Sequence, residues 1–258
     1  MLQDVATLLG LSPHLDPWRL AALVGVALLV GMGKSGLSGV GLLAIPLLAS
    51  TVGALPSTGL MLLLLISGDV FAVSAYRRHA DGRMILRLLP ATLAGIAIGA
   101  VVGRFLSPTG FRWAIAAVVV VCLVLMVFQE WKGADKAIPH SVALALLIGA
   151  ASGFATMVGN AAGPIFAVYL LAMGFDKSRF LGTSAVFFLI VNLTKVPIQV
   201  ALLHNIGWTT VLSALALLPA VGLGLWVGLK LLKLIPEKAF RRLVIAMTAL
   251  AAVRLMLP

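Results

Sequence analysis

The fold of this chain is decided by residues 20–51, which read LAALVGVALLVGMGKSGLSGVGLLAIPLLAST. As one helix this stretch would be about 48 Å long. The hydrocarbon core of a bilayer is only about 30 Å thick, and two full crossings would need about 40 residues. The segment GMGKSGLSGVG at 31–41 is a glycine-rich break, and the backbone groups that such a break frees must face protein or water. We therefore predict two short helices joined near mid-membrane, that is, a re-entrant hairpin.

The rest of the chain is apolar in the same way. A second 32-residue run, 141–172, is interrupted by SGFATMVGNAAGP at 152–164 and predicts a second hairpin. Charged residues make up 10% of the chain and the mean hydropathy is +1.15, whereas soluble domains carry about 25% charged residues. Other runs long enough to cross a bilayer lie at 56–76, 84–106, 111–130, 180–204, 209–232 and 240–257. The sequence predicts an all-α integral membrane protein with a single transmembrane domain over residues 1–258.

The two halves of the chain resemble each other in the order of their residues. The matching pairs are Gly59 with Gly182, Asp69 with Asn192, Pro90 with Pro219, Gly95 with Gly224 and Gly99 with Gly228. Each match is weak by itself, since apolar sequences often match by chance, but the shared order indicates a duplication. We expect a first repeat over residues 20–130 and a second over 141–257, each a broken helix or re-entrant hairpin followed by three transmembrane helices.

Loop charges predict how these repeats are oriented. If every run crossed once, Lys and Arg would split 8 to 9 between the two faces, which shows no bias. If the two long runs enter and leave on one face, 13 basic residues in loops 77–87, 132–136, 177–179 and 230–242 oppose 4, namely Arg19, Arg104, Arg112 and Arg254. The positive-inside rule favours this second arrangement and makes those four loops cytoplasmic. Each half then crosses three times, so the two repeats are inverted, and the net charge of +11 reports orientation instead of a nucleic-acid partner.

The hairpin tips are the candidate site. The second helix of each hairpin should begin near residues 39–41 and near Gly163, at mid-membrane. A helix N-terminus exposes free N–H groups and a partial positive charge, so two such ends that meet from opposite faces can bind an anion. The alternative is that the glycines only allow close helix packing.

Two lysines lie inside apolar runs, where a charge costs roughly 2.5–3.5 kcal/mol. They are Lys34, at the first predicted tip, and Lys195, in the centre of its run. Asn192, Lys195 and Gln199 share one helical face, which should point into the bundle. Asp69 is the acid that lies well inside an apolar run. It could pair with one of the lysines, carry a proton or bind sodium as a coupling ion, and the sequence leaves these three roles open.

The tip segments resemble the motifs of the TauE/SafE family of sulfite and organosulfonate permeases. The first is GMGKSGLSGVGLLAIPLLA at 31–49, and the second is TMVGNAAGPIFAVYLLAMG at 156–174 followed by FLGTSAVFFLIVNLTKVP at 180–197. The resemblance implies a multi-pass carrier in a bacterial inner membrane that moves anions such as sulfite or sulfoacetate without ATP. The substrate-binding residues expected from the motifs and the tips are Lys34, Ser35, Gly36, Ser38, Gly39, Asn160, Ala161, Gly163, Asn192 and Lys195.

Other functions stay open at this point. The chain could carry a different small organic anion, or it could be a non-transporting membrane subunit that holds a partner. An intramembrane enzyme has no support, because the sequence contains no evident acid–base or metal cluster. We therefore expect no enzymatic activity, no cofactor and no metal site. The expected partners are the lipid bilayer and a small anion, with a coupling ion or proton and a homodimer left open.

Overall fold

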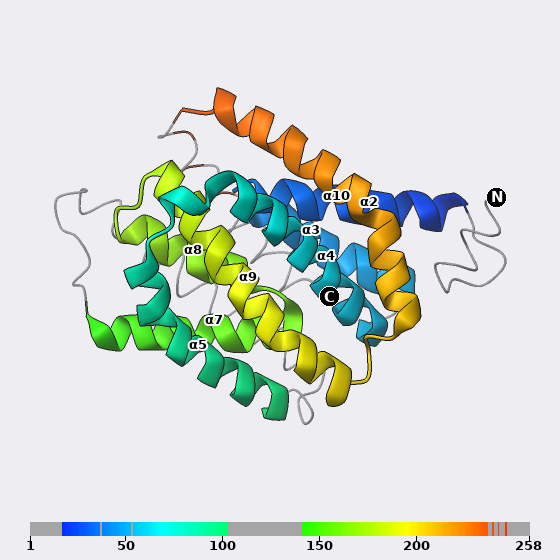
Figure 1. Cartoon of the computed structure of the whole chain (residues 1–258), viewed down its shortest axis with the longest axis horizontal. Helices are drawn as coiled ribbons and strands as arrows, with labels where there is room; N and C mark the ends of the chain where they lie inside the picture. Colours follow the sequence, from blue (N-terminus) through cyan, green and yellow to red (C-terminus); the bar gives the residue numbers. More distant parts are fainter. Residues whose placement is uncertain are drawn as a thin grey trace.

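A computed structural model describes residues 17–36, 38–52, 54–102 and 141–236, together with residues 239, 242 and 246. These residues are helical apart from short connections, as the sequence predicts (Figure 1). The predicted span 111–130 lies outside them, as does 240–257 apart from two single residues. The elements in chain order are α2 (Pro17–Lys34), α3 (Ser38–Val52), α4 (Ala54–Tyr76), the short 3-10 helix η1 (Arg77–His79), α5 (Gly82–Val102), α7 (Val142–Gly159), α8 (Ala162–Ala172), α9 (Lys177–Ala201) and α10 (Trp208–Leu234).

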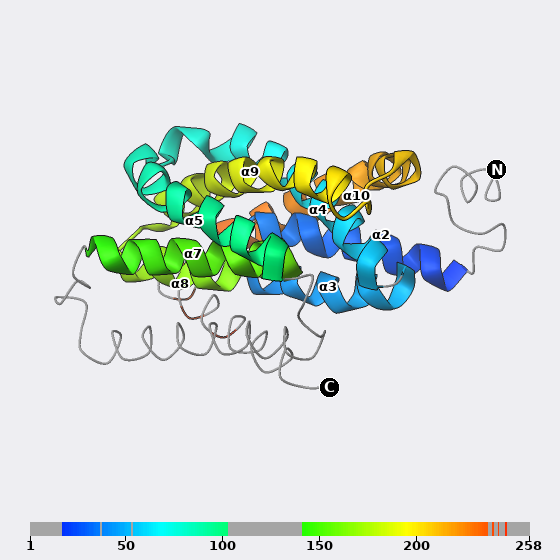
Figure 2. The same ribbon diagram turned by 90° about the horizontal axis from the view of Figure 1, so that it is seen from below.

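Both long apolar runs contain a break. Helix α2 ends at Lys34 and α3 begins at Ser38, while α7 ends at Gly159 and α8 begins at Ala162. The chain turns at Gly36, whose φ of 108° is a backbone conformation that glycine adopts readily. It also turns at Asn160, whose φ of 53° lies in the left-handed region that asparagine tolerates. Figure 2 shows that the two helix pairs extend toward the centre from opposite ends of the molecule.

Six helices are long and apolar enough to cross a membrane, so the protein is a multi-pass membrane protein with six candidate spans within the described residues. Four of the six candidate spans correspond to α4, α5, α9 and α10, and they agree with spans predicted from the sequence. The other two are α2 and α7, each 18 residues long. They are longer than the short first helices that we expected, because the first part of each interruption, residues 31–34 and 152–159, stays helical.

Glycines allow α2 to lie very close to α10. A Cβ atom on Gly31 would come within 2.1 Å of the Val221 carbonyl oxygen, and one on Gly224 within 2.2 Å of the Leu28 carbonyl oxygen. Real Cβ atoms do not approach other atoms so closely, so any larger residue would force the helices apart. Small residues are the usual means of close helix packing in membranes.

The same arrangement joins α5 to α7. A Cβ atom on Gly153 would come within 2.0 Å of the Thr92 carbonyl oxygen, and one on Gly95 within 2.1 Å of the Ala150 carbonyl oxygen. Each of these interfaces therefore pairs a helix of the first half with a helix of the second. Between them, α4 and α9 pack against each other.

Charged residues stabilise the end of the bundle where α4 stops. The Arg179 guanidinium lies 2.6 Å from the Asp81 carboxylate, which also accepts a hydrogen bond from the Met84 N–H at 3.0 Å. The Met84 N–H, and after it Arg179, hold the pKa of Asp81 below its usual range, although partial burial acts in the opposite sense. Nearby, the Lys177 amine donates to the Leu232 carbonyl and, at 3.1 Å, to that of Ile235. A cation placed there stabilises the C-terminus of α10.

Candidate functional site

A cavity lies where the two turns meet α4 and α9. Its volume is about 90 Å³, whereas one water molecule needs roughly 10–15 Å³ measured in the same way. The space therefore suits several water molecules or a small anion. Its lining comes from α2, α3, α4, α7, α8, α9 and the turns between them. The residues are Val30, Gly33, Lys34, Gly36, Gly41, Ile45, Met61, Leu65, Asp69, Ala72, Thr156, Asn160, Gly163, Phe180, Leu181, Ser184, Ala185, Phe188 and Asn192.

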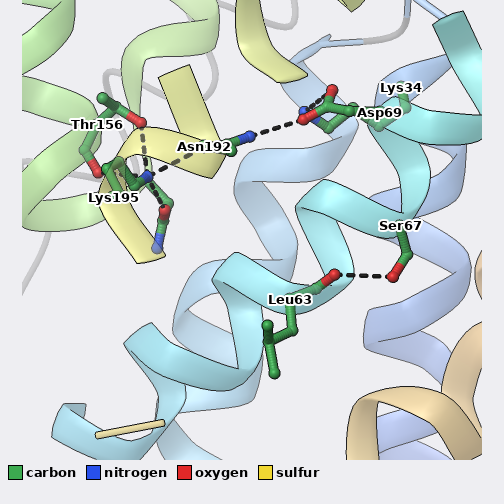
Figure 3. Close-up of polar contacts among 8 residues, drawn as sticks. Lys34, Leu63, Ser67, Asp69, Thr156, Asn192 and Lys195 are labelled. Atoms are coloured by element: carbon green, nitrogen blue, oxygen red, sulfur yellow. Dashed lines mark hydrogen bonds and ion pairs between the residues drawn. The ribbon is translucent and has the colours of Figure 1, made fainter. Parts of the chain in front are cut away.

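Lys34 forms an ion pair with Asp69 in the wall of this cavity. The Lys34 amine lies 2.6 Å from Oδ1 of Asp69, and the carboxylate is fully buried (Figure 3). The same amine lies 5.1 Å from the centre of the Phe188 ring, within range of a cation–π interaction. Lys34 is the last residue of α2, and Asp69 lies in α4. The pair therefore joins the end of α2 to α4.

Lys195 is fully buried in α9 and binds neutral oxygen atoms. Its amine lies 3.0 Å from the Thr156 carbonyl, 2.9 Å from Thr156 Oγ1, 2.6 Å from Asn160 Oδ1 and 3.1 Å from Asn192 Oδ1. An ammonium group has three donors and no acceptor, so these oxygens satisfy it without neutralising its charge. Thr156 and Asn160 come from the end of α7 and its turn, so Lys195 joins α9 to this turn.

Asn192 connects the two lysines. Its Nδ2 donates to Asp69 Oδ2 at 2.7 Å, and its Oδ1 accepts from Lys195 (Figure 3). The resulting row is Lys34, Asp69, Asn192 and Lys195, in that order. It holds two ammonium groups and one carboxylate, and the cavity lining adds no further acid among the described residues. Basic side chains therefore outnumber acidic ones in this row by one.

The structure brings most of the expected site residues together. Lys34, Gly36, Asn160, Gly163 and Asn192 line the cavity together with Asp69, and Lys195 binds two of these residues directly. Ser38 and Gly39 begin α3, directly after the first turn.

Two expected residues lie elsewhere. Ser35 is buried against Gly228 of α10, and its hydroxyl donates to the Met32 carbonyl at 2.7 Å. Ala161 is buried at the start of α8 and is absent from the cavity wall. Neither residue lines this cavity, and their role in substrate binding stays a prediction.

Sequence reasoning missed Thr156 and Phe188. Thr156 is uncharged, yet it supplies two of the oxygens that accept hydrogen bonds from Lys195. Its position four residues before Asn160 puts both on one face of the helix end, and that spacing could have revealed it. Phe188 belongs to a cluster in which its ring meets Phe166 and Phe187 edge-on, with ring centroids 5.1 and 5.4 Å away. Nothing in the spacing of these aromatic residues predicts a lysine beside them.

The fold and this charged cavity define a class: polytopic helical membrane transporters with a central polar site. The family model described as "Sulfite exporter TauE/SafE" matches residues 23–255. The chain therefore belongs to the TauE/SafE family, whose members are transporters and not enzymes. Searches of curated proteins and of solved structures found no match.

Proposed function

We propose that the chain is a secondary transporter that binds a small sulfur-containing anion, such as sulfite, sulfoacetate or another organosulfonate, in the central cavity. The observation that carries this proposal is that the row Lys34, Asp69, Asn192 and Lys195 holds two basic side chains and one carboxylate. A buried charge without a counter-ion is costly. An anion in the cavity would offset that cost, and charge-assisted hydrogen bonds to it are stronger than neutral ones.

The proposed ligand meets the two lysines differently. Lys34 lines the cavity and would contact the anion directly. Lys195 lies behind Asn160 and Asn192, which both line the cavity and both accept from its amine. Its charge would act through these amides, unless Asn160 moves aside. Gly36 and Gly163, at the turns, leave room for the ligand to approach the backbone.

Transport through this cavity is supported by an inverted-repeat architecture, which belongs to the same proposal. Gly31 and Gly153 are 122 positions apart, as are Leu28 and Ala150, and all four make the close contacts described above. Their partners on α10 and α5 keep a constant spacing of 129, from Thr92 to Val221 and from Gly95 to Gly224. The two interfaces therefore match residue for residue, although the hairpins extend from opposite ends (Figure 2). Inverted repeats with broken helices place a substrate site at their interface, near mid-membrane.

The proposed location is a bacterial inner membrane, with loops 77–87, 131–140, 174–179 and 233–239 in the cytoplasm. The charge split of 13 to 4 supports this topology. Single cysteines at positions 80 and 206, in a Cys122→Ala background, should be labelled by an impermeant reagent from opposite sides. Labelling of both from the same side would contradict the inverted repeat without bearing on which anion is bound.

The substrate class is tested by ligand-dependent stabilisation of the purified protein. A ligand that binds only the folded form stabilises it by about 2.7 kcal/mol at a hundredfold excess over its Kd. We expect sulfite and sulfoacetate to raise the melting temperature of the wild type and of Lys230→Met, an exposed lysine above Trp226. Lys195→Met should lose most of that shift. Larger shifts with carboxylate anions than with sulfur anions would point to a carrier of other organic anions.

A further inference from the structure

The Asp69 carboxylate occupies the position that an oxyanion would take in the cavity wall. Its Oδ1 meets the Lys34 amine at 2.6 Å, and its Oδ2 accepts from Asn192 Nδ2 at 2.7 Å. Both donors belong to residues that line the cavity. A sulfonate or sulfite group presents the same kind of atoms: negatively charged oxygens on one centre. The carboxylate and such an anion would therefore compete for the same two donors.

The charge state of Asp69 depends on this competition, because few other charged groups face its carboxylate. Helix α2 contributes Lys34, and α9 contributes Asn192 and, beyond it, Lys195. Helix α3 also packs against α4 and has no titratable residue.

The remaining neighbours of α4 keep their charges away from Asp69. Helix α10 approaches this part of α4 with Val221, an apolar residue that lies near Gly68. The lysines of α10, Lys230 and Lys233, lie near its C-terminal end. In α4 and η1 the titratable groups after Asp69 begin with Tyr76, about two turns further along. Lys34 is therefore the direct counter-ion of Asp69.

We infer that Asp69 is a tethered competitor of the transported anion: the anion displaces it from Lys34, and the released carboxylate takes up one proton. The inference rests on the proposed function, since it needs an anion in this cavity. A buried carboxylate that loses its partner ion is strongly unfavourable, whereas its neutral acid can stay in place and still accept from Asn192. The charges balance, because one monoanion and one proton enter together and Lys34 stays protonated. Asp69 thereby couples anion transport to a proton.

A binding experiment with a non-titrating anion tests this role. Methanesulfonate stays a monoanion between about pH 5 and pH 8, so any pH dependence of its binding arises in the protein. One proton taken up per anion makes the affinity of the wild type rise up to about tenfold for each pH unit lowered. Asp69→Asn has no carboxylate to displace, so we expect it to bind methanesulfonate more tightly than the wild type at about pH 8 and with no pH slope.

Asp81→Asn is the matched control, since it makes the same chemical change in an ion pair outside the cavity, and its pH slope should equal that of the wild type. A wild type without a slope, an Asp69→Asn protein that keeps the slope, or one that binds more weakly than the wild type at every pH would each overturn the inference.

A second measurement needs only the wild type, in case Asp69→Asn does not fold. Calorimetric titration in buffers of different ionisation enthalpy counts the protons taken up on binding. We expect a value close to one per methanesulfonate toward the alkaline end of this range, and a value of zero throughout would overturn the role of Asp69. The proposed function fails differently: wild type and Lys195→Met would then bind methanesulfonate equally, or neither would bind it at any pH.

Discussion

The two lysines of the central site both lie inside the bundle, but they differ in burial and in their partners. Lys34 meets a carboxylate at 2.6 Å and lines the cavity. Lys195 is fully buried among uncharged oxygens from Thr156, Asn160 and Asn192. The end of α2 is thus joined to α4 by an ion pair, and the end of α7 is joined to α9 by hydrogen bonds from Lys195 to uncharged oxygens. The difference teaches that two buried lysines can be accommodated in different ways: one has a counter-ion, and the other has only uncharged hydrogen-bond acceptors.

The largest effect on stability should follow from breaking the ion pair on the Lys34 side. Lys34→Met leaves the buried Asp69 carboxylate without its counter-ion, and removing one partner of a buried pair costs about 3–5 kcal/mol. Chemical unfolding in detergent measures the loss. The double variant Lys34→Met, Asp69→Asn should recover most of it, since no unpaired charge remains. A single variant as stable as the wild type would show that Asp69 does not depend on Lys34.

The next effect is on binding, at the other lysine. Lys195→Met keeps most of the apolar side chain and removes the uncompensated charge, so it should insert and fold. The Lys195 charge would act on the anion across Asn160 and Asn192, and at an effective dielectric constant of about 20 such an interaction contributes a few kcal/mol. We therefore expect sulfite affinity to fall about 10- to 100-fold, as measured by calorimetry. The comparison of the two lysines fails if a folded Lys195→Met protein binds sulfite as tightly as the wild type.

A smaller effect is expected at Asn160, where two variants distinguish the role of the side-chain oxygen from that of the left-handed backbone. Asn160→Ala and Asn160→Gly both remove the oxygen that lies 2.6 Å from the Lys195 amine. Only alanine also strains the left-handed backbone at φ 53°, by about 1–2 kcal/mol. The two variants should change sulfite affinity alike, while the alanine variant unfolds more easily. Equal stabilities would mean that the turn relaxes when its side chain is lost.

The smallest effect is expected at the exposed ion pair, which sets a scale for the buried one. Asp81 and Arg179 are also 2.6 Å apart, but the Arg179 side chain is half exposed, and such pairs contribute about 0.2–1 kcal/mol. Because the folded protein lowers the pKa of Asp81, this contribution is present at neutral pH and is lost as the pH falls below about 4. The stability difference between the wild type and Asp81→Asn should therefore shrink in acid. A difference that grows there would reverse the sign assigned to this pair.

The amino-acid sequence determined the class of fold. The all-helical membrane character follows from long apolar runs, because a bilayer accepts only chains that satisfy their backbone internally. The breaks near Lys34 and Asn160 were also predicted, within a few residues, from clustered glycine and polar residues. Their exact place was not, since Gly31 and Gly153 stay helical. Whether such a glycine ends a helix or packs against a neighbour depends on what lies beside it, and only the contacts with α10 and α5 show which.

The candidate site divides in the same way. Sequence alone identified Lys34, Asp69, Asn192 and Lys195, because a polar residue inside an apolar run is costly and so stands out at any position. It left open which lysine meets Asp69, and it missed Thr156 and Phe188. Those assignments depend on distances between helices that are far apart in the chain, and the 3.6-residue period of one helix carries no information about its neighbours. The tertiary structure decided that Lys34 meets the acid and that Lys195 lies among uncharged oxygens.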